Sequence, residues 1–216
     1  GSQNDMATIR LQVGIPAGIQ STVINFSNAL LQSSVNSFGS TTMAGYTAAN
    51  NIFGFLYVSV NAITQACMSF TSQNYGLRKL KRMDKILMDC LILTVVVSLV
   101  LGGGVYLFGA EILRLYTEEA EVIRCGIEIF AYTTVTYFLC GIMDLFPGAL
   151  RGMDRSTVPM ILSVIGTVGT RIVWVFWLFP AHRSLAFLFI SYPSSWLITI
   201  AMQVICFYLV RRKVHG

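Results

Sequence analysis

Charged side chains are scarce in this sequence. Only 12% of its 216 residues are Asp, Glu, Lys or Arg, and 55% are hydrophobic, whereas a soluble domain carries about 25% charged residues. This is too little charge to cover a water-soluble surface. The net charge is +5, but most Lys and Arg residues stand at the ends of apolar runs. That placement is typical of membrane proteins and argues against nucleic acid as a partner.

Side chains suited to metal binding or catalysis are equally few. The two histidines, His182 and His215, have no ligand-spaced partner, and the five cysteines form no CxxC pair. We therefore expect no metal site, no disulfide set and no cofactor. The predicted membrane spans contain no Ser/His/Asp set and no paired catalytic carboxylates, so an enzyme is not expected.

Six stretches are apolar enough to cross a bilayer, which takes about 20 residues of helix. They comprise residues 11–37, 44–72, 86–109, 122–147, 157–180 and 185–210. Because backbone polar groups in lipid must be paired within their own segment, each stretch is expected to be a helix rather than a strand. The sequence predicts an all-α, polytopic membrane bundle in which residues 1–216 form a single transmembrane lobe.

The basic residues predict the orientation of this bundle. With a cytoplasmic N-terminus, eleven of the fifteen Lys and Arg residues lie on the inner side, three on the outer side and one, Arg171, within a helix. The outer connection between the third and fourth predicted helices is acidic, with Glu111, Glu118, Glu119 and Glu121. Since positive charge is retained inside, both termini are expected in the cytoplasm.

The first two predicted helices, over residues 11–37 and 44–72, each carry a stripe of neutral polar side chains. The side chains of a stripe are three or four residues apart, which places them on one helical face. An amide facing acyl chains would cost about 2–7 kcal/mol, so both stripes must face protein or water. Hydrogen bonds between helices are one explanation, and a hydrated cavity is the other. We predict a cavity that binds substrate through Asn25, Asn28, Gln32, Tyr57, Asn61 and Gln65.

Among the ionisable side chains of the predicted spans, Arg171, Glu128 and Asp144 are the candidates for a functional site, because charged groups inside a membrane are rare and mark such sites. Arg171 is the deepest, about 13 Å from the outer edge at 1.5 Å of rise per residue. On the same rise, Glu128 differs from it in depth by about 5 Å and Asp144 by about 12 Å. A lone intramembrane Arg needs a partner, so we predict an Arg171–Glu128 interaction, either as a direct ion pair or through water. All three residues are candidates for ion coupling.

Three segments resemble the multidrug and toxic compound extrusion (MATE) family. Residues 69–76, SFTSQNYG, resemble the turn between the second and third helices of a lobe. Residues 148–152, GALRG, and 156–159, STVP, resemble the signature that follows the fourth helix. Residues 14–18, GIPAG, look like the opening of a lobe's first helix. Spacing and topology agree along essentially the whole chain.

The resemblance implies a twelve-helix transporter with two six-helix lobes around a central cavity, and this chain would be the C-terminal lobe. Its partners would be the lipid bilayer and an N-terminal six-helix lobe of the same or a companion chain. Its expected activity is antiport across a bacterial-type cell membrane, exporting drugs or organic cations in exchange for protons or sodium by rocking between two states.

The carboxylates depart from the family pattern. Many cation-coupled members place one near the cavity middle on the first or fourth helix of this lobe. Here the first helix has none between Ile9 and Thr42, and Glu128 and Asp144 on the fourth are both off-centre. Coupling would rest on one of these two residues or on the other lobe.

Two other functional classes stay open. One is a lipid or lipid-linked oligosaccharide flippase of the same superfamily, although such proteins typically have a more cationic cavity to hold phosphates. The other is a non-transporting membrane subunit or channel. Because the sequence begins Gly1-Ser2 without Met, we expect it to be a piece of a longer chain.

Overall fold

The computed structural model describes residues 2–215, and in that range the chain is helical without a β-strand. The long helices are α1 (Ser2–Asn36), α2 (Ser40–Gly76), α3 (Leu80–Leu107) and α9 (Leu185–His215). Shorter ones are α4 (Gly109–Arg114), α5 (Ala120–Thr133) and α6 (Tyr137–Gly152). The predicted all-α fold is confirmed.

One further helical rod joins α6 to α9 and changes its pitch along its length. It begins as α7 (Thr157–Ser163), passes through the π-helical turn η1 (Val164–Gly169) and the single α-turn α8 (Thr170–Val173), and ends in the π-helical η2 (Trp174–Leu178) and the 3₁₀ turn η3 (Phe179–Ala181). We call this segment the α7–η3 rod.

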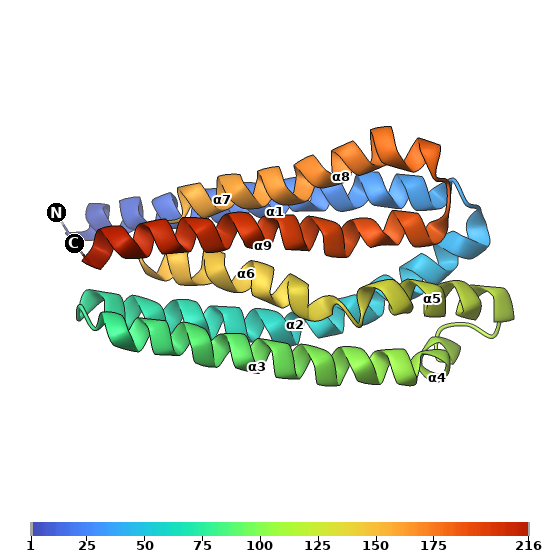
Figure 1. Ribbon diagram of the computed structural model, residues 1–216, viewed down its shortest axis with the longest axis horizontal. Helices are drawn as coiled ribbons and strands as arrows, with labels where there is room; N and C mark the ends of the chain where they lie inside the picture. Colours follow the sequence, from blue (N-terminus) through green and yellow to red (C-terminus); the bar gives the residue numbers. More distant parts are fainter. Residues whose placement is uncertain (1, 216) are drawn as a thin grey trace.

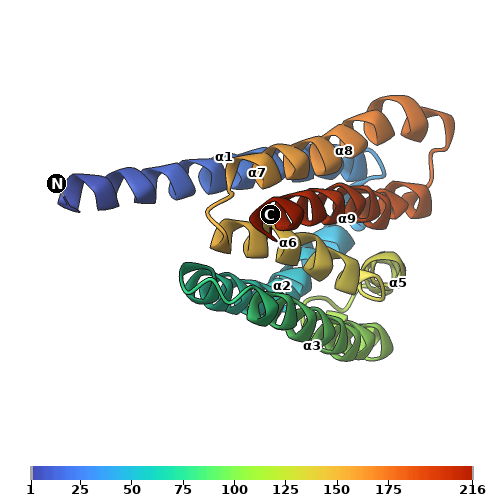
Figure 2. The ribbon, with the colours of Figure 1, turned by 60° about the vertical axis from the view of Figure 1, so that its left-hand side comes forward.

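The helices run up and down along the long axis of the molecule (Figure 1). α2 packs against α3, α5 and α6, and α6 packs against α9. α1 packs against the α7–η3 rod, and its N-terminal part extends beyond the rest of the bundle (Figure 2). Both termini therefore lie at the same end as the α2–α3 and α6–α7 connections.

Four helices are long and apolar enough to cross a membrane, namely α2, α3, the α7–η3 rod and α9. α5 and α6 together make a fifth span, although they are bent by 49° at the break between them. α1 has 35 residues but is not among these spans, because its polar stripe takes the place of apolar side chains. The predicted span over residues 11–37 therefore stays a prediction.

Threonine side chains account for the bend between α5 and α6. The hydroxyls of Thr133, Thr134 and Thr136 donate hydrogen bonds of 2.6–2.8 Å to backbone carbonyls one turn earlier. Such bonds compete with the helical ladder and bend the helix. Residues 122–147 were predicted as one span, and the apolar pattern gave no sign of this break.

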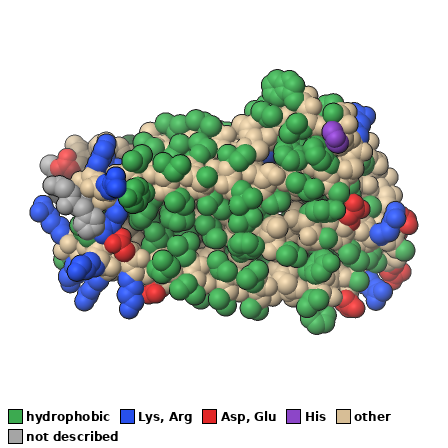
Figure 3. All heavy atoms as spheres, viewed as in Figure 1, with side chains coloured by type: hydrophobic (Ala, Val, Ile, Leu, Met, Phe, Trp, Pro, Cys, Tyr) green, Lys and Arg blue, Asp and Glu red, His purple; other side chains and the backbone are tan. Residues whose placement is uncertain are grey.

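Apolar side chains cover the sides of the molecule, while Lys and Arg gather at the end that carries both termini (Figure 3). Phe55, Val100, Leu107 and Trp177 are each at least 67% exposed. A surface of this kind would promote aggregation in water, whereas acyl chains are as apolar as these side chains. The chain is a multi-pass membrane protein.

The basic end predicts which side of the membrane each connection occupies. A cysteine replacing Glu118, in the connection between α4 and α5, should react with a membrane-impermeant maleimide in intact cells. A cysteine replacing Lys79, in the α2–α3 turn, should react only after permeabilisation, because positively charged ends are retained in the cytoplasm. Both variants need a background without the native cysteines. The reverse labelling pattern would contradict this orientation.

Close packing of α3 against the α5–α6 break predicts a difference between two adjacent glycines. A Cβ at Gly102 would collide with the carbonyl oxygen of Thr134, whereas one at Gly103 would meet nothing within 4 Å. Gly102→Ala should lower the stability of the bundle by about 1–3 kcal/mol, as overpacking does. Gly103→Ala should leave it unchanged or raise it by up to about 1 kcal/mol. Thermal unfolding in detergent measures both, and equal effects would refute this packing.

Candidate functional site

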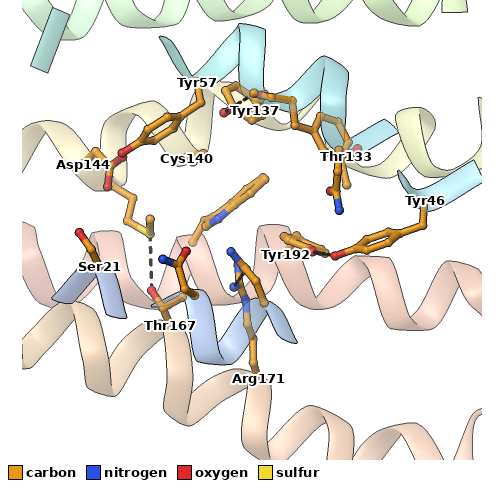
Figure 4. A pocket seen from close by; sticks show the side chains of 17 residues that line it. Ser21, Tyr46, Tyr57, Thr133, Tyr137, Cys140, Asp144, Thr167, Arg171 and Tyr192 are labelled. Carbon is orange, nitrogen blue, oxygen red and sulfur yellow. Dashed lines mark hydrogen bonds between the residues drawn. The ribbon is translucent and has the colours of Figure 1, made fainter. Parts of the chain in front are cut away.

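A cavity of about 510 Å³ lies among the helices, and Figure 4 shows the side chains that surround it. Residues of α1, α2, α5, α6, the α7–η3 rod and α9 contribute to its wall. Its volume is in the range of small-molecule sites, about 300–1,000 Å³. Elements that are far apart in the sequence thus meet around one space.

The polar stripes of α1 and α2 form part of this wall. Asn25 and Asn28 line the cavity from α1, and Asn50 and Tyr57 line it from α2. Three of the six side chains predicted to bind substrate, Asn25, Asn28 and Tyr57, are therefore at the cavity.

The other three predicted side chains are not part of its lining. Gln32 and Gln65 are exposed and Asn61 is half-buried. α1 and α2 run in opposite directions, so their stripes leave the cavity at opposite ends. Gln32 follows Asn28 toward the α1–α2 turn, and Asn61 and Gln65 follow Tyr57 toward the end that carries the termini. A binding role for these three stays a prediction.

Aromatic rings form the opposite part of the wall. Phe53 of α2 stacks on Tyr137 of α6 with 6.4 Å between ring centroids. Tyr137 meets Trp196 of α9 edge-on at 6.1 Å, and Tyr192 lies 5.8 Å from Trp196. These rings offer a nearly continuous apolar surface, and their faces attract organic cations.

Arg171 is the positively charged group of the cavity wall. Its side chain is only 3% exposed, and its Nη1 donates hydrogen bonds to Asn28 Oδ1 at 2.6 Å and to Ser27 Oγ at 3.3 Å. Its guanidinium carbon lies 4.7 Å from the ring centroid of Tyr192, whose hydroxyl is 3.3 Å from that of Tyr46. The cation is held by neutral groups from two other helices, α1 and α9, and Tyr46 of α2 contacts it only through Tyr192.

The pitch of the α7–η3 rod positions this arginine. Arg171 stands on the single α-turn between the two π-helical segments η1 and η2. Within η1, a Cβ at Gly166 would collide with Thr199 Oγ1, so glycine lets the rod pack closely on α9. π-turns are frequent at functional sites, since each changes the face on which later side chains appear.

The predicted Arg171–Glu128 ion pair is wrong. Glu128 is exposed, and the ion pairs within residues 2–215 are Arg124–Glu121 and Arg211–Asp84. Similar depth in the membrane does not place two side chains on facing sides of their helices. Ile129 and Phe130 occupy the interior face of α5, where both are fully buried.

Asp144 supplies a carboxylate to the same cavity. It lines the wall from α6, half-buried, and Figure 4 shows it beside Tyr57, away from Arg171. It forms no ion pair with a described residue. The Nε atom of Arg151, the nearest basic residue along the chain, donates instead to the Pro147 carbonyl at 3.3 Å. Asp144 is thus the available carboxylate of the cavity.

Several wall residues were missed by the sequence analysis. Tyr46, Phe53, Tyr137, Tyr192 and Trp196 line the cavity but look like ordinary lipid-facing or core aromatics in an apolar run. No spacing signal separates them from the other aromatic residues. Asn50 belonged to the α2 stripe and could have been included. Within residues 2–215 no cluster of His, Cys, Asp and Glu is placed to hold a metal ion.

The contact between Arg171 and Asn28 predicts unequal effects of two neighbouring amides. Asn28→Ala removes the 2.6 Å acceptor of a buried cation and should lower stability by about 1.5–3 kcal/mol. Asn25→Ala changes an exposed cavity side chain and should shift it by no more than about 0.5 kcal/mol. Thermal unfolding of the purified protein distinguishes them, and equal shifts would show that the contact does not stabilise the bundle.

Comparison with known proteins finds transporters. The MatE family matches residues 16–177. "Probable multidrug resistance protein YoeA" of Bacillus subtilis is 22% identical over 200 residues, covering 92% of this chain and 43% of that protein. "Multidrug export protein MepA" of Staphylococcus aureus is 20% identical, covering 74% and 36%. The bent-form crystal structure of the Vibrio cholerae MATE transporter VcmN superposes with a TM-score of 0.85 at 17% identity, covering 94% and 46%. The chain spans less than half the length of these proteins.

Proposed function

Since this chain belongs to the MatE family, whose members are membrane transporters, we propose that it is one lobe of a cation-coupled antiporter exporting drugs or organic cations. The two curated relatives described above are named for multidrug resistance or export. The chain covers 43% of the first and 36% of the second. A lobe of similar size, in the same or a companion chain, would complete the transporter.

The observation that carries this proposal is the cavity, with its unpaired carboxylate beside aromatic rings. Asp144 and Tyr57 lie at one end, and the Phe53, Tyr137 and Trp196 rings continue from there. An organic cation gains from both features, through attraction to the carboxylate and cation–π contact with the rings.

The same carboxylate also suits the exchange of an organic cation for a proton or a sodium ion. A proton or a sodium ion that neutralises Asp144 removes the charge that attracts an organic cation, so the ion and the cation compete for one site. Such competition is sufficient for antiport if the lobes rock only when the site is occupied. Either ion fits this scheme.

The other two coupling candidates fit it less well. Glu128 is exposed on α5 and outside the cavity lining. Arg171 lines the cavity, but an arginine side chain does not release its proton in proteins. Its charge is a fixed part of the wall rather than an exchanging group.

Both termini are proposed to lie in the cytoplasm of a bacterial-type cell. The gathering of Lys and Arg at the end that carries both termini supports this orientation. α1, whose polar residues Asn25 and Gln32 are exposed in the isolated chain, is proposed to be the sixth span and to face the other lobe across the central cavity.

The test is dye efflux from vesicles that contain the whole natural protein. Asp144→Asn should reduce ion-gradient-driven efflux of the cationic dye ethidium by at least tenfold, because it removes the charge that both ligands share. Glu128→Gln is the matched control and should leave efflux unchanged. Proton and sodium gradients imposed separately identify the coupling ion.

Three results would contradict the proposal. Equal loss of efflux in both variants would mean that the cavity is not the coupling site. Full efflux by Asp144→Asn would exclude its carboxylate. Vesicles that move a fluorescent phospholipid between leaflets but not ethidium would indicate a flippase instead.

A further inference from the structure

The positive charge of Arg171 does not contribute to the binding or exchange of cations. Its guanidinium repels an organic cation, and no carboxylate among the described residues lies within 4 Å of it. Its hydrogen-bond partners, Ser27 and Asn28, are neutral. An arginine buried in a membrane protein without a counter-ion is costly, so a cavity that served only cations would be better without it.

We propose that Arg171 is an anion-binding site in the cavity wall, and that the cavity takes zwitterionic solutes with a carboxylate, sulfonate or phosphate group beside their positive group. This inference rests on the proposed function only in so far as the cavity binds solutes.

The guanidinium keeps donors available for such a group. Arginine has five N–H donors in a planar fork that matches a carboxylate or phosphate. Only Nη1 is engaged by Asn28 and Ser27. The Nη2 atom has no hydrogen-bond partner among the described residues and is not among the fully buried atoms, whereas Nε is both unpartnered and fully buried, so Nη2 is the donor that a ligand can reach. Arg171 lines the cavity, and in Figure 4 its guanidinium end points into the cavity.

The surroundings hold the guanidinium in place for a ligand. Asn28 and Ser27 hold it from α1, and its guanidinium carbon lies over the ring of Tyr192 of α9, 4.7 Å from the ring centroid. The Tyr192 hydroxyl in turn contacts Tyr46 of α2. A cation with fixed orientation loses little freedom when it binds an anion, which favours affinity.

The two charges of the wall are separated. Asp144 lies at the Tyr57 end and Arg171 beside Tyr192, with Cys140 between them in the lining. A zwitterion that spans this gap meets an opposite charge at each end and aromatic rings along its middle. A solute with a single positive charge uses only one of the two ends.

Two dyes of nearly identical shape distinguish a cavity that binds zwitterions through Arg171 from one that binds only cations. Rhodamine 110 has a free carboxylate beside its cationic xanthene, and rhodamine 123 is its methyl ester without the negative charge. Fluorescence anisotropy gives the dissociation constant of each dye with the whole purified protein. Arg171→Gln should weaken rhodamine 110 binding about tenfold or more, since a charge-assisted hydrogen bond is worth that factor. Rhodamine 123 binding should stay the same or tighten.

Two further variants distinguish an anion site from a structural tether between α1 and the rod. Arg171→Lys keeps the positive charge and should retain most of the preference for rhodamine 110. Asn28→Ala breaks the tether but leaves the guanidinium in the cavity, where Ser27 and Tyr192 still contact it, so most of the preference should be retained. Arg171→Gln removes the buried charge, which lowers the cost of burying this side chain, so the variant is expected to fold, and its unfolding temperature serves as the check.

Each result has a fixed meaning. Equal loss of both dyes in Arg171→Gln, or loss of the preference in Asn28→Ala as large as in Arg171→Gln, overturns the anion site and leaves a tether. Wild-type protein that binds rhodamine 123 but not rhodamine 110 overturns it while the proposed function stands. Arg171-dependent binding of rhodamine 110 without any ion-driven efflux supports the site and contradicts the antiporter. If neither dye binds, both proposals fail.

Discussion

The hydrogen bond from Arg171 to Asn28 joins α1 to the α7–η3 rod at a place where the guanidinium is buried and Asn28 is half-buried. A guanidinium in the hydrocarbon layer has to find acceptors within the protein. The amide stripe of α1 supplies one, and the aromatic ring of Tyr192 on α9 covers the flat face of the cation. Because three elements meet at one charge, their spacing and rotation are coupled, and the cavity exists where they cannot close completely.

The other polar groups of the cavity wall must also be kept away from lipid, although the neutral ones cost less to bury than a charged guanidinium. Asn25, Asn50 and Asp144 are polar groups that lipid would not tolerate, and each lines the cavity. The α5–α6 bend, produced by threonine hydroxyls that bond to their own helix, brings Thr133 and Tyr137 to that wall on either side of the break. These polar side chains of different helices thus lie together at the cavity, with aromatic side chains between them.

The cavity wall carries one fixed positive charge, Arg171, and one carboxylate, Asp144. In the proposed function, Asp144 takes a proton or a sodium ion that competes with an organic cation, while Arg171 keeps its proton. In the proposed scheme the aspartate serves exchange and the arginine serves selection among solutes. Assigning the two roles to different helices, α6 and the α7–η3 rod, keeps the two charges apart and prevents them from neutralising each other.

The sequence by itself determined the class of protein, because scarcity of charge and apolar runs of helical length are composition effects that need no partner. It also identified Asn25, Asn28, Tyr57, Asp144 and Arg171, since a polar group in a span is visible wherever it finally lies. Only the tertiary structure decided their partners. Depth along a helix is proportional to residue number, whereas the direction of a side chain depends on helix rotation, and the π-turns beside Arg171 and the threonine bend before α6 both alter that rotation. For this reason Arg171 meets Asn28 rather than Glu128, and the aromatic wall could not be told from ordinary lipid-facing rings until the helices were packed.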